Sequence, residues 1–348
     1  MATPLLGAWE ANIDHAVTRS PIDVCSTREE DEIVLGNLGV VRVDELGPGC
    51  ERSNLAPGDV CMLMPFGVTD RHGFAELVHA YDCPGTLGLL ARETHLPAEL
   101  LLPIPPGTRH TLEQWATYGR LFTALDLWRR AQTILQLQAP DHDPSQELIF
   151  AWGGGVALIF LQIAQQHGYR TAMTASSDVR LELITSLGIT PVDRRAFPHL
   201  NVPRRTSSQP GAHARHQESR RAFLAAVAEL SDGSGAAIVL DNIGEALYPV
   251  TLGALAREGV LATCGWKAGM RVSHLRGSEC IQRHVHLHTH VWHRHSSAAM
   301  RDWFEAGNLV PPSHAISVVN FDEIGRMART SVEQGLPDYF TLYRNELA

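Results

Sequence analysis

The sequence predicts an α/β protein built around a doubly wound parallel sheet, and three observations support this. Residues 147–188 alternate between short apolar runs and helical patterns, with a glycine cluster after the first run. Later segments repeat the alternation, which is typical of βα units. The chain of 348 residues is long for a single core, and 44 % hydrophobic with 19 % charged residues is ordinary for a folded protein, so we expect two lobes.

The first βα unit carries the pattern of a dinucleotide-binding loop. Residues 148–151 form a buried-strand run, residues 152–155 read Trp-Gly-Gly-Gly, and residues 156–166 continue as a helix. The first amides and the positive dipole end of that helix would face a pyrophosphate, as in a Rossmann-type fold. The predicted cofactor contacts here are Trp152, Gly153, Gly154, Gly155 and Val156. Two alternatives stay open: the glycines form only a tight turn, or the Trp152 indole fills the cofactor's space instead of stacking on it.

The end of the second strand, residues 170–174, indicates which nucleotide fits. Ser176, Ser177 and Arg180 follow it, and two hydroxyl groups with a guanidinium suit a 2′-phosphate, which favours NADP(H). In the alternative interpretation, one serine only caps the next helix. Asp178 keeps NAD open, because an acidic residue at this place usually binds the ribose hydroxyls.

The remaining elements follow the same alternation. We predict helices over residues 221–230, 247–255, 297–306 and 320–333, and strands over residues 237–241 and 259–264. Residues 194–219, which are rich in Pro, Ser, His and Arg, are predicted to form a surface loop.

Several motifs, in order, resemble a known family. Residues 38–60 read LGVVRVDELGPGCERSNLAPGDV. Residues 73–76 form a G-x-A-E strand, and residues 102–124 read LPIPPGTRHTLEQWATYGRLFTA. Residues 238–265 resemble the late strands of the same family. Residues 290–293 fall where its members have a His-Phe-Ala-Asn segment. The chain is similar to the medium-chain dehydrogenase/reductase superfamily, in its zinc-independent, crotonyl-CoA carboxylase/reductase-like branch of enoyl-thioester reductases and quinone oxidoreductases.

This resemblance implies two domains. A GroES-like β-barrel, shortened at its N-terminus, would comprise residues 1–125 and 300–348 and bind the substrate. A Rossmann dinucleotide-binding domain would comprise residues 126–299. The family also implies a homodimer that pairs along the edge segment 277–291, which would cover an exposed strand edge.

The implied activity is NADPH-dependent reduction of an α,β-unsaturated acyl thioester or related enone, in specialised metabolism. Gly67 and Val68 stand where the carboxylating enzymes have a Phe-Glu pair, so we expect no carboxylation. The alternatives are a reductase-derived enzyme recruited for a cyclisation or elimination, and a non-catalytic subunit.

The resemblance also names candidate residues. The catalytic candidates are His290, Thr123 and Arg120, and those beside the nicotinamide are Cys264, Gly265 and Trp266. In the alternative interpretation Thr123 only packs its helix and Arg120 only pairs with an acidic side chain.

Composition excludes several other classes. The formal net charge of −9 argues against nucleic acid, and the absence of an export or membrane-spanning segment indicates a cytoplasmic protein. The six cysteines lack C-x-x-C spacing, and the barrel lacks the zinc ligands of the alcohol dehydrogenases. Alternate histidines from His284 to His290 share one strand face, but no carboxylate or cysteine accompanies them in sequence, so no metal is expected.

Overall fold

The chain forms two compact units in the computed structural model. Residues described are 1–10, 13–14, 16, 27–200, 210–265, 269, 273, 275–307, 309, 311–333, 335–336 and 338–345. Unit 1 comprises Met1–Thr123 with Val291–Ala348, and unit 2 comprises Ala124–His290. The chain leaves unit 1 two residues before the expected position and returns to it nine residues earlier than expected.

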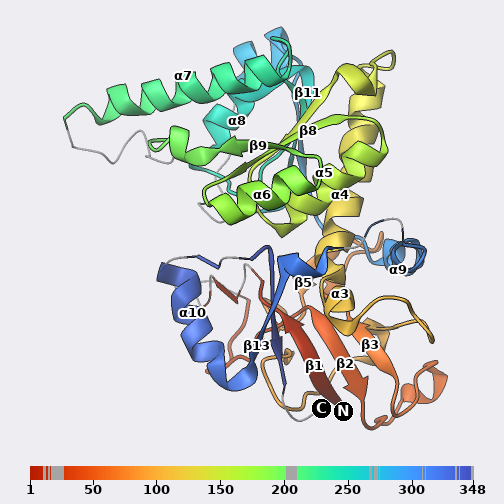
Figure 1. Cartoon of the computed structure of the whole chain (residues 1–348). Coiled ribbons are helices and arrows are strands. Elements are labelled where there is room, and N and C mark those ends of the chain that lie inside the picture. The colour runs from red at the N-terminus through yellow and green to blue at the C-terminus, as the bar shows by residue number, and fades with distance from the viewer. Residues whose placement is uncertain are drawn as a thin grey trace. The chain divides into compact units, whose positions relative to one another are not determined.

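Unit 2 contains the predicted parallel sheet (Figure 1). The strands run in the order β12-β11-β10-β7-β8-β9. From β7 the chain first adds strands on one side, β8 and β9, and then on the other side, β10 to β12, which is the doubly wound arrangement. Their bounds are β7 (Leu148–Ala151), β8 (Arg170–Ala175), β9 (Thr190–Asp193), β10 (Ala236–Leu240), β11 (Leu255–Thr263) and β12 (His286–Thr289). Each neighbouring pair is parallel, so the fold class predicted for this half is confirmed.

Helices accompany these strands. They are α4 (Tyr118–Gln138), which begins in unit 1, α5 (Gly155–Gln166), α6 (Asp178–Ser186), α7 (Ala212–Leu230) and α8 (Tyr248–Ala254). The predicted helix at 221–230 is only the second half of α7. The first half, AHARHQESR, has no apolar periodicity, which is why the sequence predicts a loop where the structure has a helix. The rest of the expected loop contains a 3-10 turn at Arg194–Ala196, and residues 201–209 lie outside the described part.

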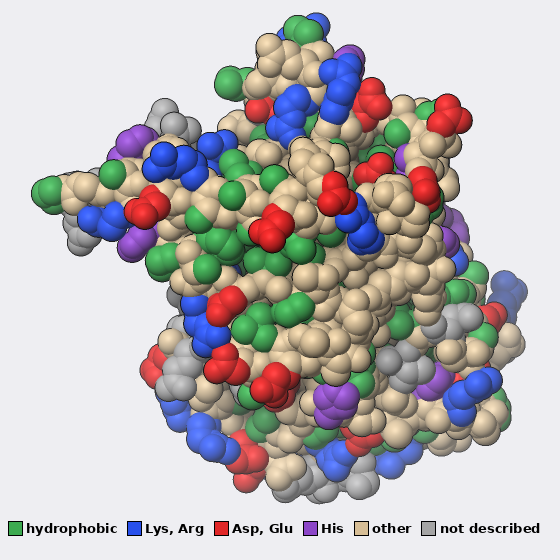
Figure 2. Space-filling model, turned by 45° about the horizontal axis from the view of Figure 1, so that its top comes forward, with side chains coloured by type: hydrophobic (Ala, Val, Ile, Leu, Met, Phe, Trp, Pro, Cys, Tyr) green, Lys and Arg blue, Asp and Glu red, His purple; other side chains and the backbone are tan. Residues whose placement is uncertain are grey.

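The first half of α7 extends beyond the sheet and is basic. Figure 1 shows this end of the helix projecting from unit 2 on the left, and Figure 2 shows Arg and His side chains over the same projection. Arg215 is exposed there, whereas Phe223 and Val227 in the second half are buried in the core. The helix is therefore anchored by its second half.

Unit 1 has a separate six-stranded sheet in the order β13-β14-β1-β2-β3-β6. Its strands are β1 (Ala2–Ala8), β2 (Gly39–Val43), β3 (Val60–Leu63), β6 (Leu101–Pro103), β13 (Ile316–Asn320) and β14 (Phe340–Arg344), and β4 (Phe66–Thr69) pairs with β5 (Ala75–Val78). All pairs are antiparallel except β13 with β14. Its helices are α3 (Leu112–Ala116), α9 (Ser297–Glu305) and α10 (Ile324–Glu333).

Short helical turns complete the chain. The 3-10 turns besides Arg194–Ala196 are Cys50–Arg52, Ala98–Leu100, Pro144–Gln146, Arg294–Ser296, Ser313–Ala315 and Phe321–Glu323, and Arg276–Gln282 is a π-helical segment. Among the described residues, no helix is both long and apolar enough to cross a bilayer.

Candidate functional site

The glycine loop of unit 2 has the geometry of an anion-binding turn. Gly154 adopts φ 138°, which side chains rarely allow, and it precedes α5 with no side-chain cap. A Cβ on Gly153 would lie 2.8 Å from the carbonyl oxygen of Thr174, and the Gly153 amide donates to the Thr174 hydroxyl at 3.3 Å. The loop therefore lies close against β8, and Gly155 and Val156 begin a helix whose first amides have no partner within the helix.

The side chain of Trp152 lies inside the unit, away from any ligand. The indole is fully buried, stacks on Phe223 with ring centroids 4.7 Å apart, and donates from Nε1 to Oγ1 of Thr251 at 2.8 Å. Both expectations for this side chain, stacking on a ligand and filling the cofactor's space, are therefore wrong. The physical reason is that the residue after β7 turns toward the core between the sheet and α7.

The end of β8 presents hydroxyl and basic groups. Ser176 and Ser177 are exposed, and the Ser177 hydroxyl accepts from the Arg180 amide at 3.4 Å, so the capping role anticipated as an alternative is present. Asp178 pairs with Arg195 at 2.6 Å. The Asp178 carboxylate is therefore engaged by the guanidinium of Arg195.

Arg195 was missed by sequence reasoning. It follows β9 within the segment assigned to a loop, and its guanidinium also contacts Asp193, whose pKa is lowered by that hydrogen bond. The signal was present in the sequence, because a basic pair directly after a parallel strand lies at the same edge as the end of the preceding strand.

The loops after β10 and β11 approach each other closely. The Cys264 thiol donates to Oδ1 of Asn242 at 3.2 Å. A Cβ on Gly265 would lie 2.2 Å from the Asn242 carbonyl oxygen, so only glycine fits there. Trp266 lies outside the described residues.

Arg120 has a structural role within unit 1. Its guanidinium pairs with Glu10 at 3.2 Å and donates to the carbonyl oxygens of Trp9, at 2.5 Å, and Tyr339, at 3.0 Å. The charged group also lies 5.7 Å from the ring centroid of Phe340. These contacts connect the start of α4 to the end of β1 and the start of β14. The prediction that Arg120 contacts substrate is therefore corrected, because its donors are engaged by the protein.

Thr123 is likewise engaged internally. It is buried, its hydroxyl donates to the Gly119 carbonyl oxygen at 2.8 Å, and it accepts from Nε1 of Trp292 at 2.7 Å. The hydroxyl proton is therefore not available to polarise a substrate carbonyl, and the alternative that Thr123 packs its helix holds. Trp292, which sequence reasoning passed over, is the residue that occupies this hydroxyl.

The side chain of His290 is buried. Only 2 % of its side chain is exposed, neither ring nitrogen makes a hydrogen bond, and Nδ1 lies 3.5 Å from Oδ2 of Asp126. Burial, and to a lesser extent the electrostatic effect of the neighbouring His288, lowers the pKa of His290 to about 3. The expectation that this imidazole is open to substrate is therefore wrong for this structure. In the described part of the chain, no group of three or more His, Cys, Asp or Glu side chains is arranged to hold a metal ion.

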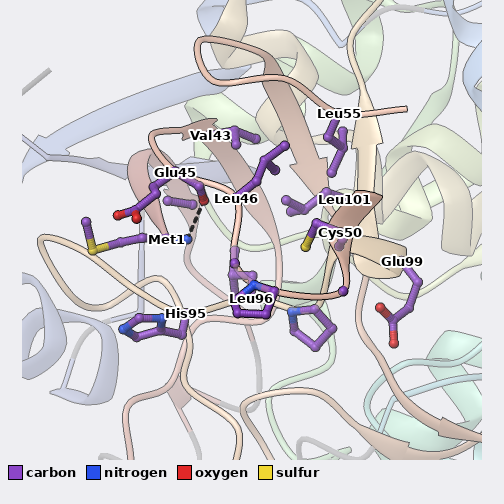
Figure 3. A pocket seen from close by; sticks show the side chains of 16 residues that line it. Met1, Val43, Glu45, Leu46, Cys50, Leu55, His95, Leu96, Glu99 and Leu101 are labelled. Atoms are coloured by element: carbon purple, nitrogen blue, oxygen red, sulfur yellow. Dashed lines mark hydrogen bonds between the residues drawn. The ribbon is translucent and has the colours of Figure 1, made fainter. Parts of the chain in front are cut away.

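Unit 1 contains a pocket that none of the predicted site residues lines. Its volume is about 360 Å³, and Figure 3 shows its apolar walls, with Leu46, Leu55, Leu96 and Leu101 around it. The Met1 amino group at its side donates to the Glu45 carbonyl oxygen at 2.8 Å. All the residues that line this pocket belong to unit 1.

Comparison with known proteins identifies the fold. No family model matches the sequence. The crotonyl-CoA carboxylase/reductase AntE, solved in complex with NADP, superposes with a TM-score of 0.77 at 20 % identity, over 99 % of this chain and 86 % of that one. The alcohol dehydrogenase of Aeropyrum pernix gives 0.75 at 18 % identity, over 99 % and 91 %. Escherichia coli K-12 YhdH with bound NADPH gives 0.67 at 16 % identity, over 99 % and 90 %.

The chain shares the overall fold of these solved structures. Identities of 16–20 % establish the fold alone. The expected pair of folding units, one with a Rossmann-type parallel sheet and one with a separate, mainly antiparallel GroES-like sheet, is thereby confirmed.

Proposed function

We propose that this protein is an NADPH-dependent reductase of an α,β-unsaturated acyl thioester or related enone. The observation that carries the proposal is the glycine loop, where Gly153 lies against Thr174 and Gly154 turns the chain into α5. Similar folds have been solved with NADP and with NADPH bound. When bound, NADPH would supply a hydride to the β-carbon of the substrate.

The residues of unit 2 account for binding. The first amides of α5 would bind the pyrophosphate. Ser176, Ser177, Arg180 and the Nη1 group of Arg195, whose Nε and Nη2 are engaged by Asp193 and Asp178, would bind the 2′-phosphate through hydroxyl and charge-assisted hydrogen bonds. Gly265 lets the loop after β11 lie directly against the backbone of Asn242. Arg120, Thr123 and His290 are engaged by other groups or buried, so none of them is assigned as the proton donor. The protein would act by positioning the nucleotide and the substrate.

We propose that reduction proceeds without carboxylation. Gly67 in β4 has no room for a side chain, since a Cβ would lie 2.6 Å from that of Cys83, and Val68 is aliphatic and 41 % exposed. No aromatic–acid pair therefore stands at these two positions.

Fluorescence titration with NADPH and NADH, followed by an assay with crotonyl-CoA with and without bicarbonate, tests the proposal. We expect tighter binding of NADPH and consumption of NADPH that does not depend on bicarbonate. Failure to bind either nucleotide would overturn the reductase assignment and support a non-catalytic subunit.

A second candidate function is a non-redox step carried out on the same scaffold. The observation that favours it is that all three predicted catalytic side chains are taken up by internal contacts or burial. Nucleotide binding without NADPH consumption, over a panel of enoyl thioesters and enones, would support this candidate over the reductase.

We further propose that the protein acts in the cytoplasm as a homodimer. Strand β12 lies at one end of the sheet of unit 2, and an uncovered edge is prone to aggregate. Pairing of two β12 edges would cover it in a closed, two-fold arrangement.

A further inference from the structure

A chain of buried hydrogen bonds runs through unit 2 from the glycine loop. Nε1 of Trp152 donates to Oγ1 of Thr251 at 2.8 Å, and that hydroxyl lies 2.9 Å from Oδ2 of Asp241, to which it donates. All three side chains are at most 1 % exposed. The hydroxyl also lies 3.0 Å from the Leu247 carbonyl oxygen, so Thr251 is held on α8 while it joins the other two groups.

The chain ends on the backbone of the loop after β10. Oδ1 of Asp241 accepts from the amides of Ile243, at 2.8 Å, and Gly244, at 3.0 Å. Burial raises the pKa of Asp241, while these amides and the Thr251 hydroxyl oppose the shift. Every polar atom along this path has a partner, as a buried network requires.

One end of the network is the glycine loop of the proposed nucleotide site, and the other end is the loop after β10, which lies against the loop after β11 that the site also uses. Trp152 begins the glycine loop, and Asn242, next to Asp241, contacts Cys264 and leaves room only for glycine at 265. The last backbone bond between the neighbouring strands is the Trp152 amide to the Leu240 carbonyl oxygen, at 3.1 Å. Beyond that point, the side-chain network provides the connection between the loops.

Tryptophan suits position 152 for a physical reason. An indole can stack on Phe223 and also donate one hydrogen bond, whereas phenylalanine lacks the donor. The tryptophan at the start of the glycine loop is therefore explained by a partner 99 residues later in the chain.

We propose that Trp152, Thr251 and Asp241 are positioning residues that hold the glycine loop and the loop at 241–244 in one fixed arrangement. A dinucleotide would then meet preformed loops, which lowers the entropy lost on binding. The part of the inference that concerns the nucleotide rests on the proposed function. The coupling of the two loops does not.

Hydrogen–deuterium exchange on the full chain without nucleotide tests the coupling. Thr251→Val keeps the shape of the side chain and removes the hydroxyl, so exchange should rise both in peptides covering residues 150–157 and in peptides covering 241–247. Thr251→Ser restores the hydroxyl and should exchange like the wild type. Val227→Ala, a cavity variant in the same core, controls for general loss of stability and should not raise exchange selectively in these two loops.

Nucleotide titration tests the consequence. Thr251→Val should weaken NADPH and NADH alike, by roughly ten-fold, because a buried donor and acceptor lose their partner while the 2′-phosphate contacts stay unchanged. Thr251→Ser and Val227→Ala should bind both nucleotides as the wild type does.

The outcomes are distinguishable. A rise in exchange at 241–247 alone, or an equal rise in Val227→Ala, would overturn the coupling. If the wild type binds neither nucleotide, the proposed function fails while the exchange experiment still decides the coupling. If it binds nucleotide but Thr251→Val binds equally well, the positioning role is wrong.

Discussion

Two arginine side chains, one after β8 and one after β9, are expected to make the protein bind NADPH more tightly than NADH. Arg180→Ala should weaken NADPH by about 1–3 kcal/mol and leave NADH unchanged, because only NADPH carries the 2′-phosphate that a guanidinium would bind. The same selective loss is expected for Arg195→Ala. Fluorescence titration with both nucleotides measures the difference.

The control for this experiment is Arg257→Ala, an exposed arginine of β11. It should leave both affinities unchanged. An equal loss of NADPH and NADH affinity in Arg180→Ala would show that Arg180 supports the loop and does not bind the phosphate.

His290 is expected to make stability depend on pH. Burial lowers its pKa from the ordinary value of 6.5 to about 3, so below pH 6.5 the unfolded chain takes up a proton that the folded chain does not. The contribution of the neutral imidazole to the free energy of unfolding is therefore complete above pH 6.5 and is lost as the pH falls toward 3. Between pH 7 and 5, the wild type should lose ~2 kcal/mol more unfolding free energy than His290→Gln.

Urea unfolding at both pH values measures this difference. His95→Gln, which removes an exposed imidazole, is the control and should retain the dependence of the wild type. If His290→Gln and the wild type lose equal amounts, a charged His290 is accommodated in the folded protein, and Asp126 at 3.5 Å would be its counter-ion.

At the scale of elements, the turn from β7 into α5 depends on backbone space. Gly153→Ala would place a methyl group 2.8 Å from the Thr174 carbonyl oxygen, and backbone there cannot yield without moving β8. We expect a loss of ~1–3 kcal/mol in unfolding free energy and weaker binding of both nucleotides. Chemical denaturation and titration measure the two effects.

Gly325→Ala in α10 is the matched control. A Cβ there meets nothing within 4 Å, so the change should be neutral or slightly stabilising, as alanine favours the helix. Equal behaviour of the two variants would mean that the glycine loop can move away from β8, and that its close packing does not shape the site.

At the scale of the whole molecule, we expect a homodimer at micromolar concentration. Its mass by light scattering should be twice 38.2 kDa. Ile281, 58 % exposed in the segment that leads into β12, is expected to be covered in the dimer, so Ile281→Asp should shift the mass toward the monomer.

Leu137→Asp serves as the control, because Leu137 is 80 % exposed on α4 and outside the edge segment. Its mass should equal that of the wild type. A wild-type mass of 38.2 kDa would contradict pairing of the β12 edges.

The sequence by itself determined the order of βα units and the position of the glycine loop, and it offered the capping of α6 as one of two interpretations of the serines after β8. These are local features: apolar runs, glycine clusters and a Ser-Asp-Val-Arg cap act within a few residues, so their pattern is legible along the chain. The first half of α7 was missed because its helix lacks an apolar face to mark it.

Only the tertiary structure decided what the candidate side chains do. Arg120 meets Tyr339, 219 residues away, Trp152 meets Thr251, 99 residues away, and Thr123 meets Trp292, 169 residues away. A hydrogen bond between residues so far apart depends on how strands and helices pack, and buried polar groups must find partners wherever packing places them. The sequence could therefore identify reactive residue types near a nucleotide fold, whereas packing determined which of them remain open to a ligand.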